Sequence, residues 1–134
     1  MGDVFPSAEG VTYRLLSKEV GEDGARLVFR TEKEGTLVEE EYRITEDAVT
    51  LTVRGEGRVF AEVPQLWFDG ARATDVESTA KTAAVSYGGW VARIKTDGEF
   101  SLADAVHNRN GIYRILRAWG EARVTVRFCI DPVE

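Results

Sequence analysis

Hydrophobic and polar residues alternate with a period of two along most of this chain. Residues 49–54 read Val-Thr-Leu-Thr-Val-Arg, and residues 124–130 read Val-Thr-Val-Arg-Phe-Cys-Ile. Successive side chains of a β-strand point to opposite sides, so this alternation predicts strands with one buried and one solvent-facing side. The same period recurs around residues 27–29, 38–44, 59–63, 83–87, 90–94 and 112–118. We therefore predict an all-β fold in which the following side chains are buried: Leu51, Val53, Val85, Ile94, Val126 and Phe128.

Turn sequences rich in glycine separate these segments. They include Gly21-Glu22-Asp23-Gly24, Gly55-Glu56-Gly57, Asp69-Gly70, Gly88-Gly89, Asp97-Gly98, Asn110-Gly111 and Gly120-Glu121. Regular spacing of strands and such turns is typical of an antiparallel β-sandwich. Residues 11–134 are therefore predicted to form one sandwich domain of about ten strands, preceded by a flexible N-terminal segment, residues 1–10. Little or no helix is expected. The one candidate helical turn lies at residues 101–106, where Ser101 and Asp104 suit a helix start.

The charge pattern narrows the classes of partner. The formal net charge is −6, and the 17 basic residues are interspersed with 23 acidic ones without a basic run. Neither nucleic acid nor an anionic membrane is an expected partner of such a chain. A polysaccharide or oligosaccharide, another protein domain, or a second copy of the chain fits better.

Targeting and redox signals are sparse. The first six residues lack the basic start and apolar core of a signal peptide, and no apolar run has the length of a membrane span. We therefore expect a soluble protein whose compartment stays open. The single cysteine, Cys129, is predicted to be a small strand residue, and one cysteine cannot form an intrachain disulfide.

The single histidine, His107, lies in the segment Asp-Ala-Val-His-Asn-Arg-Asn-Gly at residues 104–111. Asp104, His107 and Arg109 could supply an orienting carboxylate, a general base and an anion clamp. Alternatively, the segment is a polar connection that ends in an Asn-Gly turn. No serine or cysteine occupies a recognisable nucleophile position, and one histidine with one cysteine predicts no zinc site. We assign no catalytic residue, metal or cofactor, and keep His107 and Arg109 as candidate ligand-binding residues.

Carboxylates offer a second catalytic alternative. A pair of them could in principle act as in a glycosidase, although positions at turns favour a purely structural role. The candidates are Glu62, Asp69, Asp75, Asp97 and Asp104.

The aromatic residues indicate a binding surface. Trp67 lies beside the Asp69-Gly70 turn, and Tyr87 and Trp90 flank Gly88-Gly89. Exposed aromatic rings can stack on the apolar faces of sugar rings while neighbouring polar groups bind hydroxyls. We therefore predict ligand binding by Trp67, Asp69, Tyr87 and Trp90. The alternative is that these rings fill the core.

Three stretches carry a resemblance to a known class of domain. The phrases YRITEDAVTLTVRGEG, AEVPQLWFDG and ARVTVRFCIDP are similar to strand pairs and the closing strand of β-sandwich domains in bacterial polysaccharide-degrading enzymes. The resemblance is to C-terminal sandwich domains of heparinase-like lyases and related glycosidases. It implies an accessory domain that packs against a helical catalytic domain, and it brings no catalytic residue to this chain.

Three hypotheses about function follow. The first is a non-catalytic module of a bacterial carbohydrate-active protein that packs against a catalytic domain or partner. The second is an independent carbohydrate-binding module that uses exposed aromatic residues. The third is a small enzyme centred on His107 and Asp104. The exposure of the tryptophans separates the first two, and a pocket at His107 would favour the third.

Overall fold

The computed structural model of the protein describes the backbone of residues 4–5, 11–68, 75–108 and 111–132. It describes the side chains of residues 11–64, 76–102 and 111–132. The strands are β1 (Val4–Phe5), β2 (Val11–Gly21), β3 (Gly24–Lys33), β4 (Thr36–Ile44), β5 (Val49–Phe68), β6 (Asp75–Ser78), β7 (Thr82–Tyr87), β8 (Trp90–Thr96), β9 (Glu99–Asn108) and β10 (Gly111–Pro132). Within the described ranges there is no helix with the length and apolar character needed to cross a membrane.

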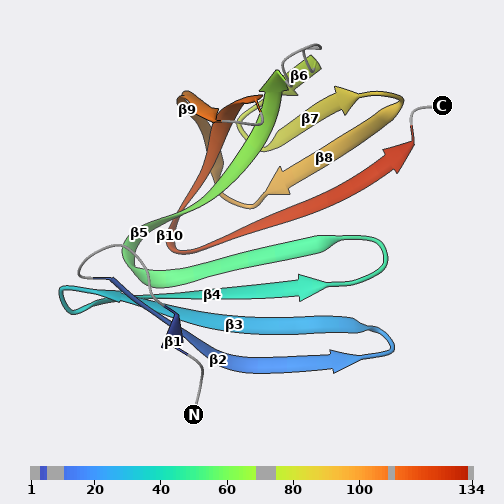
Figure 1. The fold of residues 1–134 in the computed structure, drawn as a ribbon. Helices are drawn as coiled ribbons and strands as arrows, with labels where there is room; N and C mark the ends of the chain where they lie inside the picture. Colours follow the sequence, from blue (N-terminus) through green and yellow to red (C-terminus); the bar gives the residue numbers. More distant parts are fainter. Residues whose placement is uncertain (1–3, 6–10, 69–74, 109–110, 133–134) are drawn as a thin grey trace.

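All these strands belong to one antiparallel sheet (Figure 1). Its order is β1-β2-β3-β4-β5-β10-β8-β7-β6, and β9 pairs with the first half of β10 while β8 pairs with the second half. The prediction of an all-β antiparallel fold is thus confirmed. The prediction of two stacked sheets is not confirmed, because the strands form a single sheet that does not close on itself.

The candidate helical turn at residues 101–106 does not form. These residues lie in β9, whose register with β10 pairs Ser101 with Arg117 and Val106 with Tyr113. A short helix leaves most of its terminal backbone groups unpaired, whereas a neighbouring strand offers partners along the whole segment. The edge of β10 therefore outweighs the local helix-start signal.

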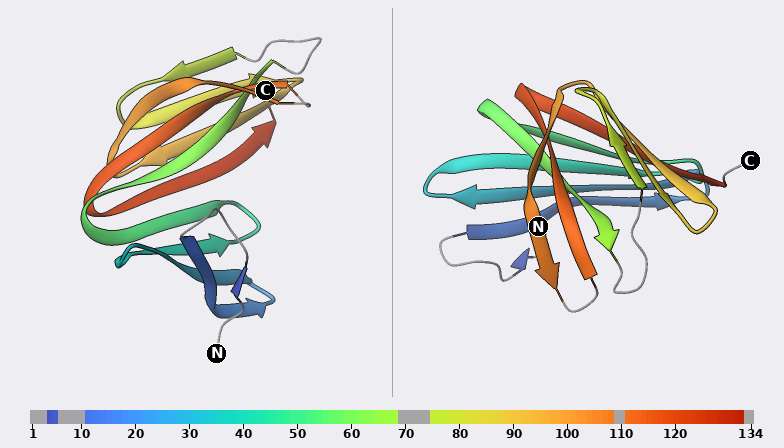
Figure 2. Two further views of the ribbon diagram at one scale, coloured as in Figure 1. Left: turned by 60° about the vertical axis from the view of Figure 1, so that its left-hand side comes forward. Right: turned by 90° about the horizontal axis from the view of Figure 1, so that it is seen from above.

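Two sequences predicted as turns are instead bends within long strands. Residues 55–57 were expected to separate two strands, as were residues 120–121, but β5 and β10 run through both sites. At the bend, Gly55, Glu56 and Gly57 stand opposite the single residue Ala122, with φ of 72° at Gly57 and 61° at Ala122. An excess residue of this kind bends and twists a strand pair. Figure 2 shows β5 turning from the lower strands into the upper part of the molecule.

The core lies on the inner side of this bend. Ile94 of β8, with Leu116 and Val124 of β10, is fully buried. Each half of the bent strand pair contributes to the cluster, which therefore joins β7 and β8 to both halves of β5 and β10. Its buried members are Val53, Val59, Ala61, Ala83, Ile94, Leu116, Ala118, Val124 and Val126.

The predicted burial holds for most positions. The side chains confirmed as buried are Val53, Val85, Ile94 and Val126. Leu51 and Phe128 are partly buried and pack against the core cluster. Thr52 departs from the expected pattern, because it is buried although it lies on the polar side of β5. Its hydroxyl lies 3.3 Å from that of Thr125 on β10, so the two hydroxyls satisfy each other across the strands.

The outer side of β2–β5 and β10, opposite the core, carries a row of basic residues. Cross-strand pairing places Arg14, Arg30, Glu39, Arg54 and Arg123 next to one another on five adjacent strands. The sequence shows no basic face because each of these residues comes from a different strand. The sheet therefore has an apolar inner side and a mainly cationic outer row.

Glu41 forms ion pairs with two further arginines on the same outer side. Its carboxylate is buried and accepts from Arg26 Nε and Nη2 at 2.8 Å and from Arg43 Nε at 3.2 Å. Arg26 and Arg43 are direct cross-strand partners, and like charges in such positions repel. Burial raises the pKa of the Glu41 carboxyl, but its hydrogen bonds and charge contacts with both arginines lower it more, so the net pKa lies below its ordinary value.

Stability should therefore depend on the charge of Glu41. Because its pKa is lower in the folded than in the unfolded chain, its contribution is present above the ordinary value of 4.5 and is lost as the pH falls. We expect Glu41→Gln to reduce the free energy of unfolding by about 1–3 kcal/mol at neutral pH and by less near pH 3. Urea unfolding at both pH values measures this. Glu39→Gln, on the same side of β4, is the control, and an equal loss in both variants would contradict the assignment.

Candidate functional site

The structure describes part of the predicted ligand-binding set. Tyr87 and Trp90 are the members with described side chains. The backbones of Trp67 and His107 lie in β5 and β9, and their side chains are outside the described residues, as is that of Asp104. Asp69 and Arg109 are outside the described residues altogether. His107 was expected in a polar connection, but its backbone is in a strand opposite Ile112.

Tyr87 and Trp90 form an exposed aromatic pair. They are cross-strand partners at the tip of the β7–β8 hairpin, whose Gly88 and Gly89 have φ of 56° and 85°. Both glycines thus adopt the left-handed conformation that a tight hairpin turn requires. Trp90 is 55% exposed and Tyr87 is 39% exposed, so neither ring fills the core. The structure brings together these two predicted residues on an accessible edge.

A second aromatic group lies on the outer side of the bent half of the sheet. The rings of Phe60 and Trp119 are cross-strand partners with centroids 4.8 Å apart. The guanidinium of Arg58 lies 4.2 Å from the centroid of Trp119, and the indole of Trp119 donates to Ser101 Oγ at 2.9 Å. These contacts fix Trp119 by stacking and hydrogen bonding, so it is less available to a ligand than Trp90.

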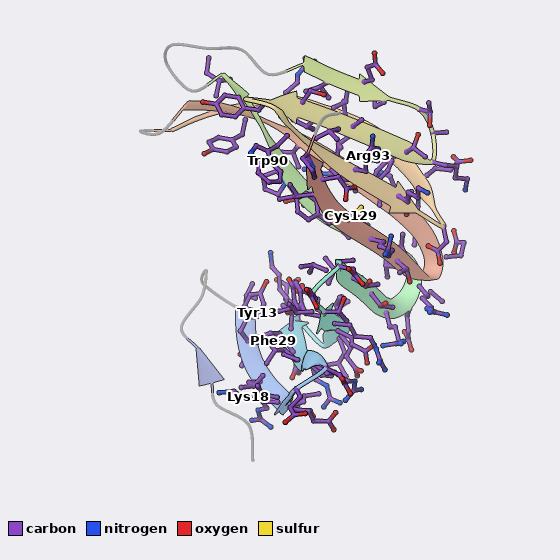
Figure 3. The ribbon with its side chains drawn as sticks, turned by 90° about the vertical axis from the view of Figure 1, so that its right-hand side faces the viewer. Tyr13, Lys18, Phe29, Trp90, Arg93 and Cys129 are labelled. Atoms are coloured by element: carbon purple, nitrogen blue, oxygen red, sulfur yellow. The ribbon has the colours of Figure 1, made fainter. Side chains whose placement is uncertain are left out.

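The inner side of the sheet contains a groove of about 490 Å³. It lies where the bend carries the second half of β5 away from β4, whose pairing with β5 ends at Gly55. One wall is the inner side of β2–β5, and the other is β5 itself between Glu56 and Glu62. Figure 3 shows Tyr13 and Phe29 on the lower strands and Trp90 on the upper strands. The groove is lined by Tyr13, Thr31, Thr36, Leu37, Val38, Glu40, Tyr42, Leu51, Val53, Glu56, Arg58, Val59, Phe60, Ala61 and Glu62.

Glu40 is the unusual residue of this groove. It lies between Val38 and Tyr42 on the inner side of β4, opposite Phe29 on one neighbouring strand and Val53 on the other. A carboxylate in such apolar surroundings must be hydrogen-bonded to offset its desolvation. The hydroxyl of Tyr42 supplies one such bond, donating to Glu40 Oε2 at 3.1 Å. A carboxylate can accept about four hydrogen bonds, so acceptor capacity remains.

The surroundings of Tyr42 raise the pKa of its hydroxyl. Burial of its ring, the charge of Glu40, the hydrogen bond to Glu40 and the neighbouring Tyr13 together raise the pKa of Tyr42 to about 12. The ring also meets Phe29 edge-on, with centroids 5.9 Å apart and planes at 87°. Tyr42 therefore stays a hydrogen-bond donor to Glu40 across the neutral and mildly alkaline range.

An alkaline titration should reveal Tyr42 directly. The chain has four tyrosines, and we expect one of them to remain protonated through pH 11 while the fold persists. Because the pKa is higher in the folded than in the unfolded chain, stability should fall as the pH rises from about 10 towards 12. Phenolate absorbance measures the ionisation, and circular dichroism monitors the fold. The late component should be missing in Tyr42→Phe; its persistence in that variant would contradict the assignment.

Sequence reasoning did not select the residues of this groove. Tyr42 lay in a predicted strand and Tyr13 was not singled out, and the groove that they line depends on the bend of β5. One signal was visible in the sequence, because Glu40 falls on the apolar side of an alternating strand between Val38 and Tyr42. An acidic residue at a position expected to be buried requires a hydrogen-bond or ionic partner, and that requirement could have drawn attention to this strand.

The described residues show no arrangement suited to metal binding. Among them, no group of three or more histidine, cysteine, aspartate or glutamate side chains could hold an ion. Cys129 lies in β10 as predicted, with its thiol 3.8 Å from the carbonyl oxygen of Arg93. No protein-family model, curated protein or solved structure matches this chain.

Proposed function

We propose that this chain is a non-catalytic β-sheet module of a bacterial carbohydrate-active protein, and that the inner side of its β2–β5 region packs against a partner domain. The resemblance of its strand sequences to accessory domains of polysaccharide-degrading enzymes supports the class of parent protein. The arrangement of apolar residues on the sheet supports the mode of packing.

One apolar row carries the proposal. Val20, Ala25, Ile44, Val49 and Phe128 are successive cross-strand partners on five adjacent strands, here called the apolar row. None of them is buried, and Val20 and Ile44 are 71% and 39% exposed. The next residue of the same row, Ile94, is fully buried where the core covers it. A continuous apolar surface of this kind is typical of a surface that another protein covers.

Hydroxyl-radical footprinting can test this packing. The isolated chain is compared with the protein purified from its natural source together with whatever is bound to it. We expect oxidation of Phe128 and Tyr42 to fall severalfold in the natural protein, because the partner domain excludes solvent from the inner side. Trp119, on the outer side, is the internal control.

Equal oxidation of Phe128 in the two samples would overturn the proposal. Light scattering of the isolated chain measures its oligomeric state and provides a second test. A stable dimer in which Phe128 is already protected would make a second copy the occupant, and the proposed partner domain would be wrong.

Carbohydrate binding by this chain is the second candidate, and the exposure of Trp90 and Tyr87 favours it. Two adjacent rings on an accessible edge can stack on a sugar. If this candidate is correct, Trp90→Ala abolishes retention on an immobilised polysaccharide and leaves the thermal unfolding midpoint unchanged. Trp119→Phe should retain binding. Retention that survives Trp90→Ala would exclude this surface.

Catalysis by the chain alone is not expected. Acid–base catalysis needs tuned groups that converge on one pocket, and the sequence offers no recognisable nucleophile. We predict no turnover of a panel of acidic and neutral polysaccharides. Activity that disappears in His107→Ala would contradict this prediction and favour the enzyme hypothesis.

A further inference from the structure

The groove on the inner side has an imbalance of charge. Among the residues that the structure describes, four charged ones line it: Glu40, Glu56, Arg58 and Glu62. Arg117 Nε pairs with Glu62 at 2.9 Å, and the guanidinium of Arg58 lies over Trp119 on the outer side of β5. Among the described residues, neither Glu40 nor Glu56 has a cationic partner within ion-pair distance. The groove therefore presents two carboxylates whose charge the sheet does not balance.

Aromatic rings stand beside these carboxylates. Tyr13 and Tyr42 line the groove from β2 and β4. Rings next to a carboxylate favour a cation, because the ring faces and the carboxylate both attract positive charge.

Thr31, which lines the groove, carries an unsatisfied hydroxyl. Thr31 lies next to Tyr13, its cross-strand partner, and the buried Thr31 Oγ1 has no hydrogen-bond partner among the described residues. Buried hydroxyls in native proteins are usually paired. A group entering the groove could complete this hydrogen bond after rotation of the Thr31 side chain.

We propose that the groove receives a lysine side chain of the partner domain, with its ammonium group bound by the Glu40 carboxylate between the rings of Tyr13 and Tyr42. This inference rests on the proposed function, since it names the chemistry of the partner surface. The ammonium donates to the free acceptor positions of Glu40, whose orientation the Tyr42 hydroxyl fixes. The lysine methylene groups then contact Leu51 and Val53 at the apolar base. A groove of about 490 Å³ is larger than one side chain, so the lysine enters as part of a longer segment.

Small lysine analogues test the site without the partner domain. N-acetyl-lysine N-methylamide is titrated into the isotope-labelled chain, and amide chemical shifts are followed by NMR. The matched probe is N-acetyl-norleucine N-methylamide, which has a similar aliphatic side chain and no charge. We expect saturable shifts at residues 38–42 and 51–53 with the lysine probe and about tenfold weaker binding of the norleucine probe.

Two variants test whether Glu40 is the carboxylate that binds the lysine probe. Glu40→Gln keeps the shape of the side chain and should weaken the lysine probe about tenfold. Glu39→Gln removes the same charge from the neighbouring position on the outer side of β4 and should leave binding unchanged. The amide spectrum of each variant confirms that the fold is retained.

Several results would overturn the inference. They are the absence of saturable shifts in the groove, equal affinity for the two probes, and lysine binding that is insensitive to Glu40→Gln. Footprinting reports separately on the partner domain. Protection of Phe128 in the natural protein together with failure of the lysine probe would reject the lysine site and retain the packing. Probe binding without any protection would reject the packing and leave a cation-binding groove.

Discussion

Replacement of Leu116 with alanine is expected to lower the free energy of unfolding by about 3–5 kcal/mol. Leu116 is fully buried in the core cluster and lies in the half of β10 that follows the hairpin with β9. Its loss removes favourable transfer energy and leaves a cavity between strands that cannot easily move together. Urea unfolding followed by circular dichroism measures the change.

Leu102 is the matched control for this substitution. It is the cross-strand partner of Leu116 on β9, yet it is 46% exposed. Leu102→Ala removes the same atoms from a partly solvated position and should cost less than about 1 kcal/mol. Similar losses in the two variants would show that the cluster around Leu116 is not the principal core.

Period-two alternation was a reliable guide to strands and their faces because burial selects one side of each strand. It placed Val53, Ile94 and Val126 on the buried side. It did not show that β5 and β10 are continuous, since a glycine-rich sequence encodes a turn and a bulge with similar residues. Whether Gly55–Gly57 reverses the chain or only bends it depends on Ala122, a partner distant in sequence.

The candidate site was less predictable because it depends on register. Tyr87 and Trp90 could be paired from the sequence, since the Gly88-Gly89 turn makes them close neighbours. Their exposure could not be deduced, because both aromatic residues and core residues occupy alternating positions. The neighbours of Glu40 on β3 and β5, like the row that joins Arg14 to Arg123, are fixed by long-range strand pairing. A single sequence does not reveal that pairing.

The tight approach of the β8–β9 turn to β10 leads to a second large effect, at Gly98. A Cβ atom on Gly98 would overlap the carbonyl oxygen of Trp119 and lie 2.8 Å from the side chain of Val124. The turn cannot move away easily. Asp97 Oδ1 accepts from Thr125 N at 2.8 Å, and the amide of Gly98 donates to Thr96 Oγ1 at 3.1 Å. We expect Gly98→Ala to lower the free energy of unfolding by about 2–3 kcal/mol through overpacking against the backbone.

Two other glycines separate the effect of space from that of conformation. A Cβ at Gly21 would meet nothing within 4 Å and Gly21 has no positive φ, so Gly21→Ala should change stability by less than about 0.5 kcal/mol. Gly35 also has open space but a φ of 80°, so Gly35→Ala should cost about 1 kcal/mol from backbone strain alone. If Gly98→Ala costs no more than Gly35→Ala, the turn can separate from β10.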